Sequence, residues 1–302
     1  MNKLVADKLA KLARGRAIAH EMQVMDTVTR YWEYPSTDES TETLIMIHGY
    51  RGNHHGLEAI AGALPNLRVI IPDLPGFGKS TPFGKSHSID NYSWWLGEFI
   101  HRLDLPSKPH LLGHSFGSIV VSHHVAHAED VKSLILENPI SAPALEGPNA
   151  IVTKIAQAFF HLAGRLPLKQ GEWLLKSWPM VRGMSIIMTK SFDSKLRAWV
   201  HAQHDSNFND FANRRVAIEG YEASVSHNVS EYAAAFTVPV LIIAGKKDDI
   251  TSIKQQKKMF ETINSSKRLE ILPRVGHLTH YESPEQVAAT IRYHIEHIHG
   301  VK

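Results

Sequence analysis

The stretch Leu111–Val121 (LLGHSFGSIVV) places a serine between two glycines, directly after one apolar run and directly before another. Glycine costs backbone entropy inside a strand or a helix, so its repeated use here needs a structural reason. The pattern fits a strand that turns sharply into a helix, with Ser115 in a strained conformation at the tip. Gly113 and Gly117 would leave room where the strand and helix backbones nearly touch. We therefore expect the Ser115 hydroxyl to be exposed at the carboxyl edge of a sheet.

Six short apolar runs predict buried strands. Most are continuous rather than alternating, which is typical of a parallel sheet with helices on both faces. The runs are Thr43–Ile47, Arg68–Ile71, His110–Leu112, Ser133–Leu136, Val238–Ala244 and Arg268–Leu272. Helix-like segments lie between them, at Leu57–Leu64, Trp94–Leu103, Ser118–Ala128, Ile253–Ile263 and Pro284–His297. Before the first run, Gln23–Tyr34 predicts an antiparallel ribbon.

This alternation of strand and helix predicts an α/β fold with a mostly parallel central sheet flanked by helices. It stops between about Pro139 and Phe236, where the composition is helical and no strand pattern is present. We therefore expect a core made of residues 1–138 and 237–302, interrupted by a helical insertion made of residues 139–236.

The composition excludes several classes of function. The 302 residues include 33 basic and 30 acidic side chains and a net charge of +3, which gives no electrostatic basis for binding nucleic acid. The absence of cysteine excludes disulfides, thiolate catalysis and cysteine-ligated metal sites. We expect a small-molecule substrate; the oligomeric state stays open.

The first 16 residues lack the continuous apolar segment of a secretory signal, and no window reaches the roughly 18 apolar residues of a membrane span. We therefore expect a cytoplasmic protein without stable membrane insertion. The same 16 residues have the composition of a short basic amphipathic helix, with leucines opposite lysines. They are predicted to form a helix or a frayed arm outside the fold.

A serine hydroxyl is a weak nucleophile and needs a general base. His277 follows the last predicted strand, in a loop that Gly276 precedes and a helix at Pro284 follows. A base on that loop can reach a serine at the end of a neighbouring strand. His280, three residues further on, is the alternative.

The base in turn needs a carboxylate that holds its tautomer and stabilises the imidazolium. Asp248 and Asp249 both lie in the loop after a predicted strand, in the segment LIIAGKKDDITS. Their position alone does not decide which of the two is the carboxylate partner of the base.

A developing oxyanion needs two backbone N–H donors. One would come from Phe116, directly after the serine. The other would come from Tyr50, in the loop HGYRGNHHG that follows the strand Thr43–Ile47. These glycines could be ordinary turn residues, but their place after the strand favours an oxyanion loop.

Four sequence blocks together resemble the α/β-hydrolase superfamily, in its capped branch of esterases, lipases, carbon–carbon hydrolases and haloperoxidase-like enzymes. The blocks are MIHGYRG, DLPGFGKS, GHSFGS, and GKKDD with GHLTHYESPEQV. The order serine, aspartate, histidine along the chain is also that of the family. The resemblance implies that residues 139–236 form the helical cap and that DLPGFGKS braces the oxyanion loop.

The resemblance also implies roles for individual residues. Ser115 would be the nucleophile, His277 the base and Asp248 the acid, since Asp248 fits the family's G-x-x-D spacing. Tyr50 and Phe116 would form the oxyanion hole. No cofactor and no metal are implied. A serine nucleophile, in place of aspartate, argues against epoxide hydrolase and haloalkane dehalogenase chemistry.

The expected function is hydrolysis of a small to medium apolar carboxylic ester through an acyl-enzyme intermediate. One alternative is hydrolysis of a carbon–carbon bond in a vinylogous diketone of the meta-cleavage-product type. That chemistry would need a cationic clamp for a substrate carboxylate. The candidates for this clamp are Arg182, Lys190, Arg197, Arg214 and Arg215. Another alternative is a non-enzymatic small-molecule receptor on the same fold.

Overall fold

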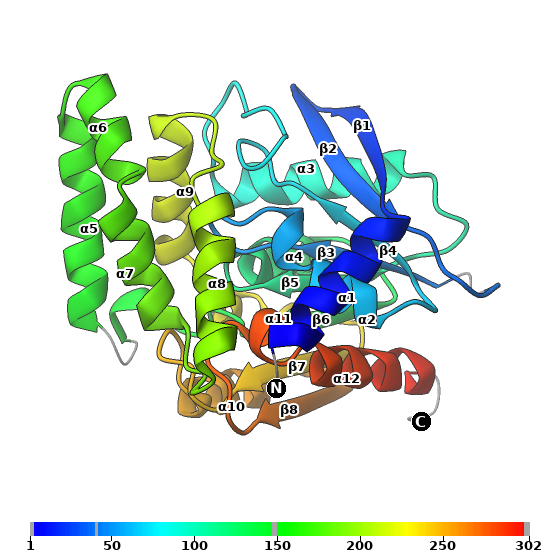
Figure 1. The fold of residues 1–302 in the computed structure, drawn as a ribbon. Coiled ribbons are helices and arrows are strands. Elements are labelled where there is room, and N and C mark those ends of the chain that lie inside the picture. Colours follow the sequence, from blue (N-terminus) through cyan, green and yellow to red (C-terminus); the bar gives the residue numbers. More distant parts are fainter. Residues whose placement is uncertain (1–2, 40–41, 147–149, 299–302) are drawn as a thin grey trace.

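The computed structural model describes residues 3–39, 42–146 and 150–298. Its centre is an eight-stranded sheet in the order β1-β2-β4-β3-β5-β6-β7-β8 (Figure 1). The strands are β1 (Ile18–Val24), β2 (Thr27–Tyr34), β3 (Thr43–Ile47), β4 (Arg68–Pro72), β5 (His110–His114), β6 (Ser133–Glu137), β7 (Val240–Gly245) and β8 (Lys267–Leu272). β1 and β2 form an antiparallel pair, β2 is antiparallel to β4, and the other pairs are parallel. The predicted α/β class and mostly parallel sheet are confirmed.

Helices flank both faces of this sheet. Outside the stretch between β6 and β7 they are α1 (Lys3–Arg16), α2 (Glu58–Ala63), α3 (Ile89–Arg102), α4 (Phe116–His127), α10 (Ile253–Thr262), α11 (Thr279–Glu282) and α12 (Pro284–His297). Between β6 and β7 they are α5 (Ala150–Arg165), α6 (Leu168–Leu175), α7 (Trp178–Met188), α8 (Ser194–Asn207) and α9 (Arg214–Ser226). Across the described ranges, none of the helices has both the length and the apolar character needed to cross a bilayer.

The apolar runs are continuous because both faces of the sheet are buried. In β3, Ile45 and Ile47 pack in one cluster with residues of α3 and α4. The alternate residues Leu44 and Met46 pack in a second cluster, with residues of α2 and α12. Successive side chains of a strand point to opposite faces, so a strand covered on both sides is apolar throughout.

Two strands begin two or more residues away from the predicted start. The ribbon begins at Ile18 rather than at Gln23, because most of the edge strand β1 is exposed or half-buried and therefore shows no apolar run. β7 begins at Val240 rather than at Val238. The intervening Pro239 has no N–H to donate to the sheet.

The prediction that the N-terminal segment lies outside the fold is wrong from Lys3 onward; Met1 and Asn2 lie outside the described residues. α1 packs against α2. Its buried face consists of small residues at helical spacing, namely Ala6, Ala10 and Ala13. A Cβ atom built on Gly62 of α2 would lie 1.9 Å from the carbonyl oxygen of Leu9, so the two helices touch backbone to backbone.

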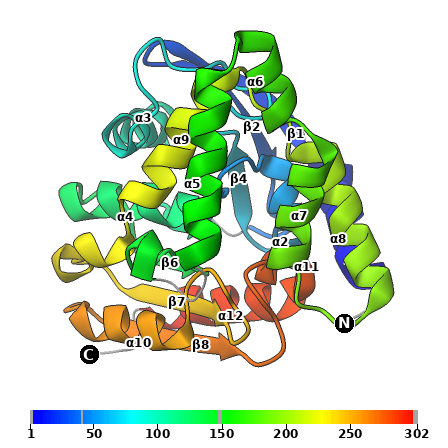
Figure 2. The same ribbon diagram turned by 90° about the vertical axis from the view of Figure 1, so that its left-hand side faces the viewer.

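The helices α5 to α9 lie together on one side of the molecule (Figures 1 and 2). They occupy the stretch between β6 and β7 where the sequence showed no strand pattern. The strands on either side of this stretch, β6 and β7, are paired with each other in parallel. The chain therefore leaves the sheet after β6, builds these helices and returns to the next position in the sheet.

Candidate active site

Ser115 lies at the turn between β5 and α4 with φ 51° and ψ −118°, a conformation that residues with a side chain rarely adopt. A Cβ atom on Gly113 would lie 2.5 Å from the carbonyl oxygen of Gly117. One on Gly117 would lie 2.4 Å from the carbonyl oxygen of Ile47, in β3. Both glycines are therefore required by the close approach of β5, α4 and β3, as the sequence predicted.

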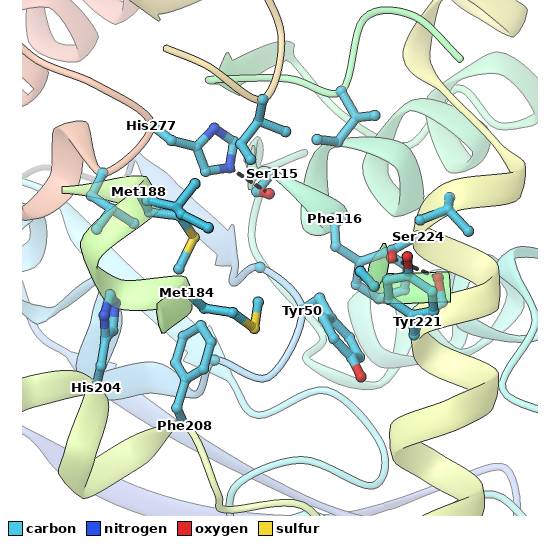
Figure 3. A pocket seen from close by; sticks show the side chains of 18 of the residues that line it. Tyr50, Ser115, Phe116, Met184, Met188, His204, Phe208, Tyr221, Ser224 and His277 are labelled. Atoms are coloured by element: carbon cyan, nitrogen blue, oxygen red, sulfur yellow. Dashed lines mark hydrogen bonds between the residues drawn. The ribbon is translucent and has the colours of Figure 1, made fainter. Parts of the chain in front are cut away.

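The side chains of Ser115, His277 and Asp248 form a continuous chain of contacts. Ser115 Oγ lies 2.8 Å from His277 Nε2, and Figure 3 shows the imidazole pointing at the serine. His277 Nδ1 lies 2.9 Å from Asp248 Oδ2. The other carboxylate oxygen of Asp248 accepts from the N–H of Ile250 at 2.7 Å, which fixes its orientation. With Nδ1–H donating to Asp248, Nε2 can accept the proton of the serine hydroxyl.

The two alternative residues lie elsewhere. Asp249 makes an ion pair with Lys190, and its side chain is 45% exposed. His280 Nδ1 lies 3.4 Å from Glu137 Oε1 rather than near Ser115. The geometry therefore brings Asp248 and His277 to the serine, and not Asp249 or His280.

The two residues expected to supply the N–H donors lie next to the serine or to a residue that touches it. Phe116 is the first residue of α4, so its N–H has no acceptor within the helix. Tyr50 follows Gly49, and a Cβ atom on Gly49 would lie only 3.3 Å from Ser115 Cβ. The loop after β3 therefore runs directly against the serine.

Buried polar side chains hold this loop in place. His48 Nδ1 donates to the carbonyl oxygen of Gly49 at 2.8 Å, which leaves Nε2 to accept from the N–H of Leu74 at 2.9 Å. Burial lowers the pKa of His48, so the imidazole is neutral, as this pattern requires. Asp73 is buried and accepts from the N–H of His54 at 2.7 Å and from its ring at 2.9 Å. The segment DLPGFGKS thus braces the loop.

Ser115 opens into a cavity of about 730 Å³. Figure 3 shows two groups of side chains on either side of the serine. Met184, Met188, His204 and Phe208, from α7, α8 and the residue after α8, form one group. Phe116 with Tyr221 and Ser224, from α4 and α9, forms the other.

Charged side chains are scarce in this cavity. Among the described residues that line it, none is lysine or arginine, and Asp249 is the only carboxylate. The five basic residues named as candidates for a carboxylate clamp do not line it. Arg182 pairs with Asp205, and the guanidinium of Arg214 donates to the carbonyl oxygen of Leu166 at 2.5 Å. The expected clamp is therefore not formed by these residues.

Glu137, at the end of β6, was not found from the sequence. It is fully buried and faces two imidazoles, with Oε2 3.5 Å from His114 Nδ1 and Oε1 3.4 Å from His280 Nδ1. The hydroxyl of Thr279 also donates to it. Burial lowers the pKa of His114 well below its usual value, and burial with the neighbouring His277 lowers the pKa of His280 to about 3. Both imidazoles are therefore neutral near pH 7.

Two groups of described residues have ligand atoms close enough to hold a metal ion. One is the cluster of His114, Glu137 and His280. The other is His54, His55 and Glu58. In the second group Glu58 already accepts from His55 Nδ1 at 2.9 Å and from an arginine of α1 at 2.6 Å. Hydrogen bonding therefore accounts for the second group.

Asn138 is a second residue that sequence analysis assigned no role. Its Nδ2 donates to the carbonyl oxygen of His277 at 2.7 Å and to Thr279 Oγ1 at 2.9 Å. Its Oδ1 accepts from the N–H of Gly245 at 2.7 Å. One side chain thus fixes the loop that carries the histidine to the strand that precedes the aspartate. The only local signal is an asparagine directly after a strand, where it adopts φ 43°.

Arg51, next to Tyr50, is a third such residue, with an almost completely buried side chain. Its guanidinium donates to the carbonyl oxygen of Leu175 at 3.0 Å and to that of Phe208 at 2.9 Å. It also donates to Asn209 Oδ1 at 2.6 Å. Burial lowers its pKa. The loop beside Ser115 is therefore tied to the ends of α6 and α8.

Comparison with known proteins agrees with this geometry. A family model described as serine aminopeptidase, S33, matches residues 38–284, a range that includes Ser115, Asp248 and His277. The chain belongs to this family of α/β-hydrolases. It is therefore a hydrolase.

The hydrolase is similar to two curated lipases. It is 27% identical to Lipase 1 of Psychrobacter immobilis over 262 residues, which cover 82% of this chain and 74% of that protein. It is 26% identical to Lipase 3 of a Moraxella species over 271 residues, which cover 84% and 78%. An esterase from Exiguobacterium antarcticum matches its structure with a TM-score of 0.74 and 22% identity, covering 92% of the hydrolase and 100% of the esterase. At that identity the structural match shows the fold alone.

Proposed function

We propose that this hydrolase cleaves a neutral carboxylic ester with an apolar acyl portion, through an acyl-enzyme formed on Ser115. The observation that carries the proposal is the contact chain from Ser115 Oγ through His277 to Asp248, at 2.8 and 2.9 Å, beside an apolar cavity. The similarity to two lipases supports the same bond type.

The reaction would follow from this geometry. Ser115 Oγ attacks the carbonyl carbon while His277 Nε2 takes its proton, and Asp248 stabilises the imidazolium. The tetrahedral oxyanion is held by the N–H groups of Tyr50 and Phe116. His277 then gives the proton to the leaving alkoxide, so that the alcohol departs and an acyl-serine remains. A water molecule, deprotonated by His277, releases the acid and restores the serine.

The lining of the cavity supports a neutral substrate. A substrate carboxylate held there would be desolvated without a cation, which is unfavourable. This argues against the vinylogous diketone alternative, which needs a cationic clamp. It also argues against an aminopeptidase, because a substrate ammonium would meet Asp249 alone, and that carboxylate already pairs with Lys190. The enzyme family argues against a receptor without turnover.

We further propose that residues 139–236 act as a cap on a core made of residues 1–138 and 237–302. Side chains from α5, α6, α7, α8 and α9 line the cavity above Ser115, which supports this division. The hydrogen bonds of Arg51 join the two parts next to Tyr50. A displaced cap would therefore disturb the loop that supplies an oxyanion donor.

The proposal is tested with p-nitrophenyl esters from acetyl to long acyl chains, on the wild type and on Ser115→Ala. We expect turnover that peaks at one chain length in the wild type and is lost in the variant. Turnover of the same size in Ser115→Ala would exclude this residue as the nucleophile. A lack of turnover with every ester, together with turnover of a dienoate, would replace the ester by the carbon–carbon alternative.

A further inference from the structure

The outer helices between β6 and β7 carry a large share of the exposed apolar side chains. In the part of the chain that the structure describes, thirteen large apolar side chains are exposed, and eight of these lie within residues 145–192. They are Leu145, Ile155, Leu162, Leu168, Trp173, Trp178, Ile186 and Phe192. Such a concentration is expected on a surface that binds a partner rather than on one that faces only water.

Most of these side chains come from three neighbouring helices. α5, α6 and α7 form the outer side of the molecule at the left of Figure 1, and the same helices face the viewer in Figure 2. On α5, Ile155 and Leu162 are seven residues apart, so they lie on one face of the helix. Trp173 lies on α6, and Trp178 is the first residue of α7.

The entrance to the cavity lies among the same residues. A side chain that both lines a cavity and is exposed marks the mouth of that cavity. Four residues meet both conditions, namely Ile155, Trp173, Pro179 and Ile250, at 65%, 72% and 37% exposure for Ile155, Trp173 and Ile250. The first three belong to α5, α6 and α7 in turn, and Ile250 lies in the loop after β7. The exposed apolar surface therefore borders one route to Ser115.

The charge of this region differs from that of the rest of the chain. Residues 150–188, which span α5, α6 and α7, contain five lysines and arginines and one acidic residue, a net charge of +4. The whole chain has a net charge of +3, so the remaining residues together carry −1. Exposed tryptophan beside lysine and arginine is the composition of surfaces that lie at the boundary between an anionic bilayer and water.

We propose that the exposed surface of α5, α6 and α7 docks on an anionic phospholipid bilayer, with Trp173 and Trp178 at the level of the headgroups. The cavity mouth would then face the lipid, so that an apolar substrate could enter without crossing water. Docking on the bilayer does not depend on the catalytic roles of Ser115 and His277, whereas entry of an apolar substrate from the lipid rests on the proposed function.

The first test is co-flotation of full-length Ser115→Ala protein, in which the proposed nucleophile is absent, with two kinds of vesicle. One kind is phosphatidylcholine, and the other contains roughly 30% phosphatidylglycerol. We expect binding to the anionic vesicles at low salt, and a loss of at least tenfold at high salt because exposed charges are screened. Equal binding to both vesicles, or to neither, would overturn the proposal.

Two tryptophans provide a matched pair of variants. Trp178 on α7 and Trp94 on α3 are both 61% exposed, and each has a basic side chain over its ring, Arg182 at 5.3 Å and Lys85 at 5.1 Å. We expect Trp178→Ala to lower the vesicle partition coefficient by at least fivefold and Trp94→Ala to leave it unchanged. Equal losses in the two variants would contradict the docking surface. Their thermal unfolding should match the wild type, since both side chains are largely in solvent.

Two double variants test how much the lysines of this surface contribute to binding of anionic vesicles. A lysine near an anionic membrane raises the partition coefficient roughly fivefold. Lys154→Ala with Lys169→Ala, on α5 and α6, should therefore weaken binding to anionic vesicles by more than tenfold. Lys257→Ala with Lys258→Ala, on α10 of the core, should not. If Trp178→Ala instead abolishes a dimer seen by light scattering, while no vesicle binds, the surface is an interface between two copies and the proposal is wrong.

Discussion

Replacement of Asn138 tests whether hydrogen bonds behind the site set the rate of the proposed reaction. A glycine at this position removes the amide but tolerates the backbone conformation of φ 43°. It leaves two buried groups without their partner, the carbonyl oxygen of His277 and the N–H of Gly245. Thr279 keeps Glu137 as its acceptor and loses little. At about 1–3 kcal/mol for each unpaired group, the expected loss of stability is about 2–6 kcal/mol.

The expected effect on kcat follows from the position of the His277 carbonyl oxygen. The His277 carbonyl oxygen belongs to the residue whose ring must reach Ser115, and a shift of about 1 Å can cost roughly 100-fold in rate. Asn138 itself is not among the residues that line the cavity. We therefore expect kcat of Asn138→Gly on p-nitrophenyl esters to fall about 10- to 100-fold, with KM nearly unchanged. Urea unfolding of the same protein gives the stability change.

Asn91→Gly is the matched control. Asn91 is also buried, and its Nδ2 donates to the carbonyl oxygen of Ser86 at 2.8 Å, at the start of α3. It should lose stability while kcat stays at the wild-type value. If Asn138→Gly is destabilised as expected but keeps the wild-type kcat, its hydrogen bonds do not position the histidine. If its stability is also unchanged, the hydrogen bonds themselves are refuted.

Three further predictions follow from individual contacts. Asp248→Asn should lose at least 100-fold in kcat, because the amide cannot stabilise the imidazolium, whereas Asp249→Asn should lose less than threefold. Equal small losses of the two variants in ester assays would refute Asp248 as the acid. Burial lowers the pKa of His204 and of His280 to about 3, so the unfolded chain binds their protons near pH 6.5 and the folded chain does not. The free energy of unfolding is therefore highest above about pH 6.5 and falls with acidification, by about 2 kcal/mol per histidine at pH 5. His204→Gln should make this pH dependence, measured by urea unfolding, less steep. Gly62→Ala should cost about 1–3 kcal/mol, since its Cβ atom would collide with the backbone of α1, and an unchanged melting temperature would contradict that packing.

The parts of the site that the sequence predicted are those that local backbone geometry demands. Gly113 and Gly117 are needed because β5, α4 and β3 touch at this turn. That requirement is visible in five consecutive residues together with the apolar runs on either side of them, and this local pattern was enough to predict Ser115 as the candidate nucleophile. The loops after the strands could be located in the same way, because parallel strands bring their carboxyl ends to one edge.

The hydrogen bonds behind the site could not be predicted in this way. Asn138 and its acceptor in His277 are 139 positions apart, and Arg51 and its acceptor in Leu175 are 124 positions apart. Their polar side chains are buried only because distant loops supply partners, and a single sequence carries no periodic signal for such pairs. An arginine in a loop is normally exposed. The burial of Arg51 became evident only from the fold.

The wrong prediction for the N-terminal helix shows how a pattern of large apolar residues can indicate the wrong buried face of a helix. The pattern favours leucine, yet Leu12 is 54% exposed, and the buried face of α1 is made of alanines. Each alanine buries less apolar surface than a leucine, but it lets the backbones of α1 and α2 come into direct contact at Gly62. Closely packed helices gain many short-range dispersion contacts, which replace the lost burial of large side chains. A helix that packs through small residues therefore looks solvent-exposed when its faces are judged by their large apolar side chains. The better signal here was alanine repeated at helical spacing, opposite a glycine in a second helix.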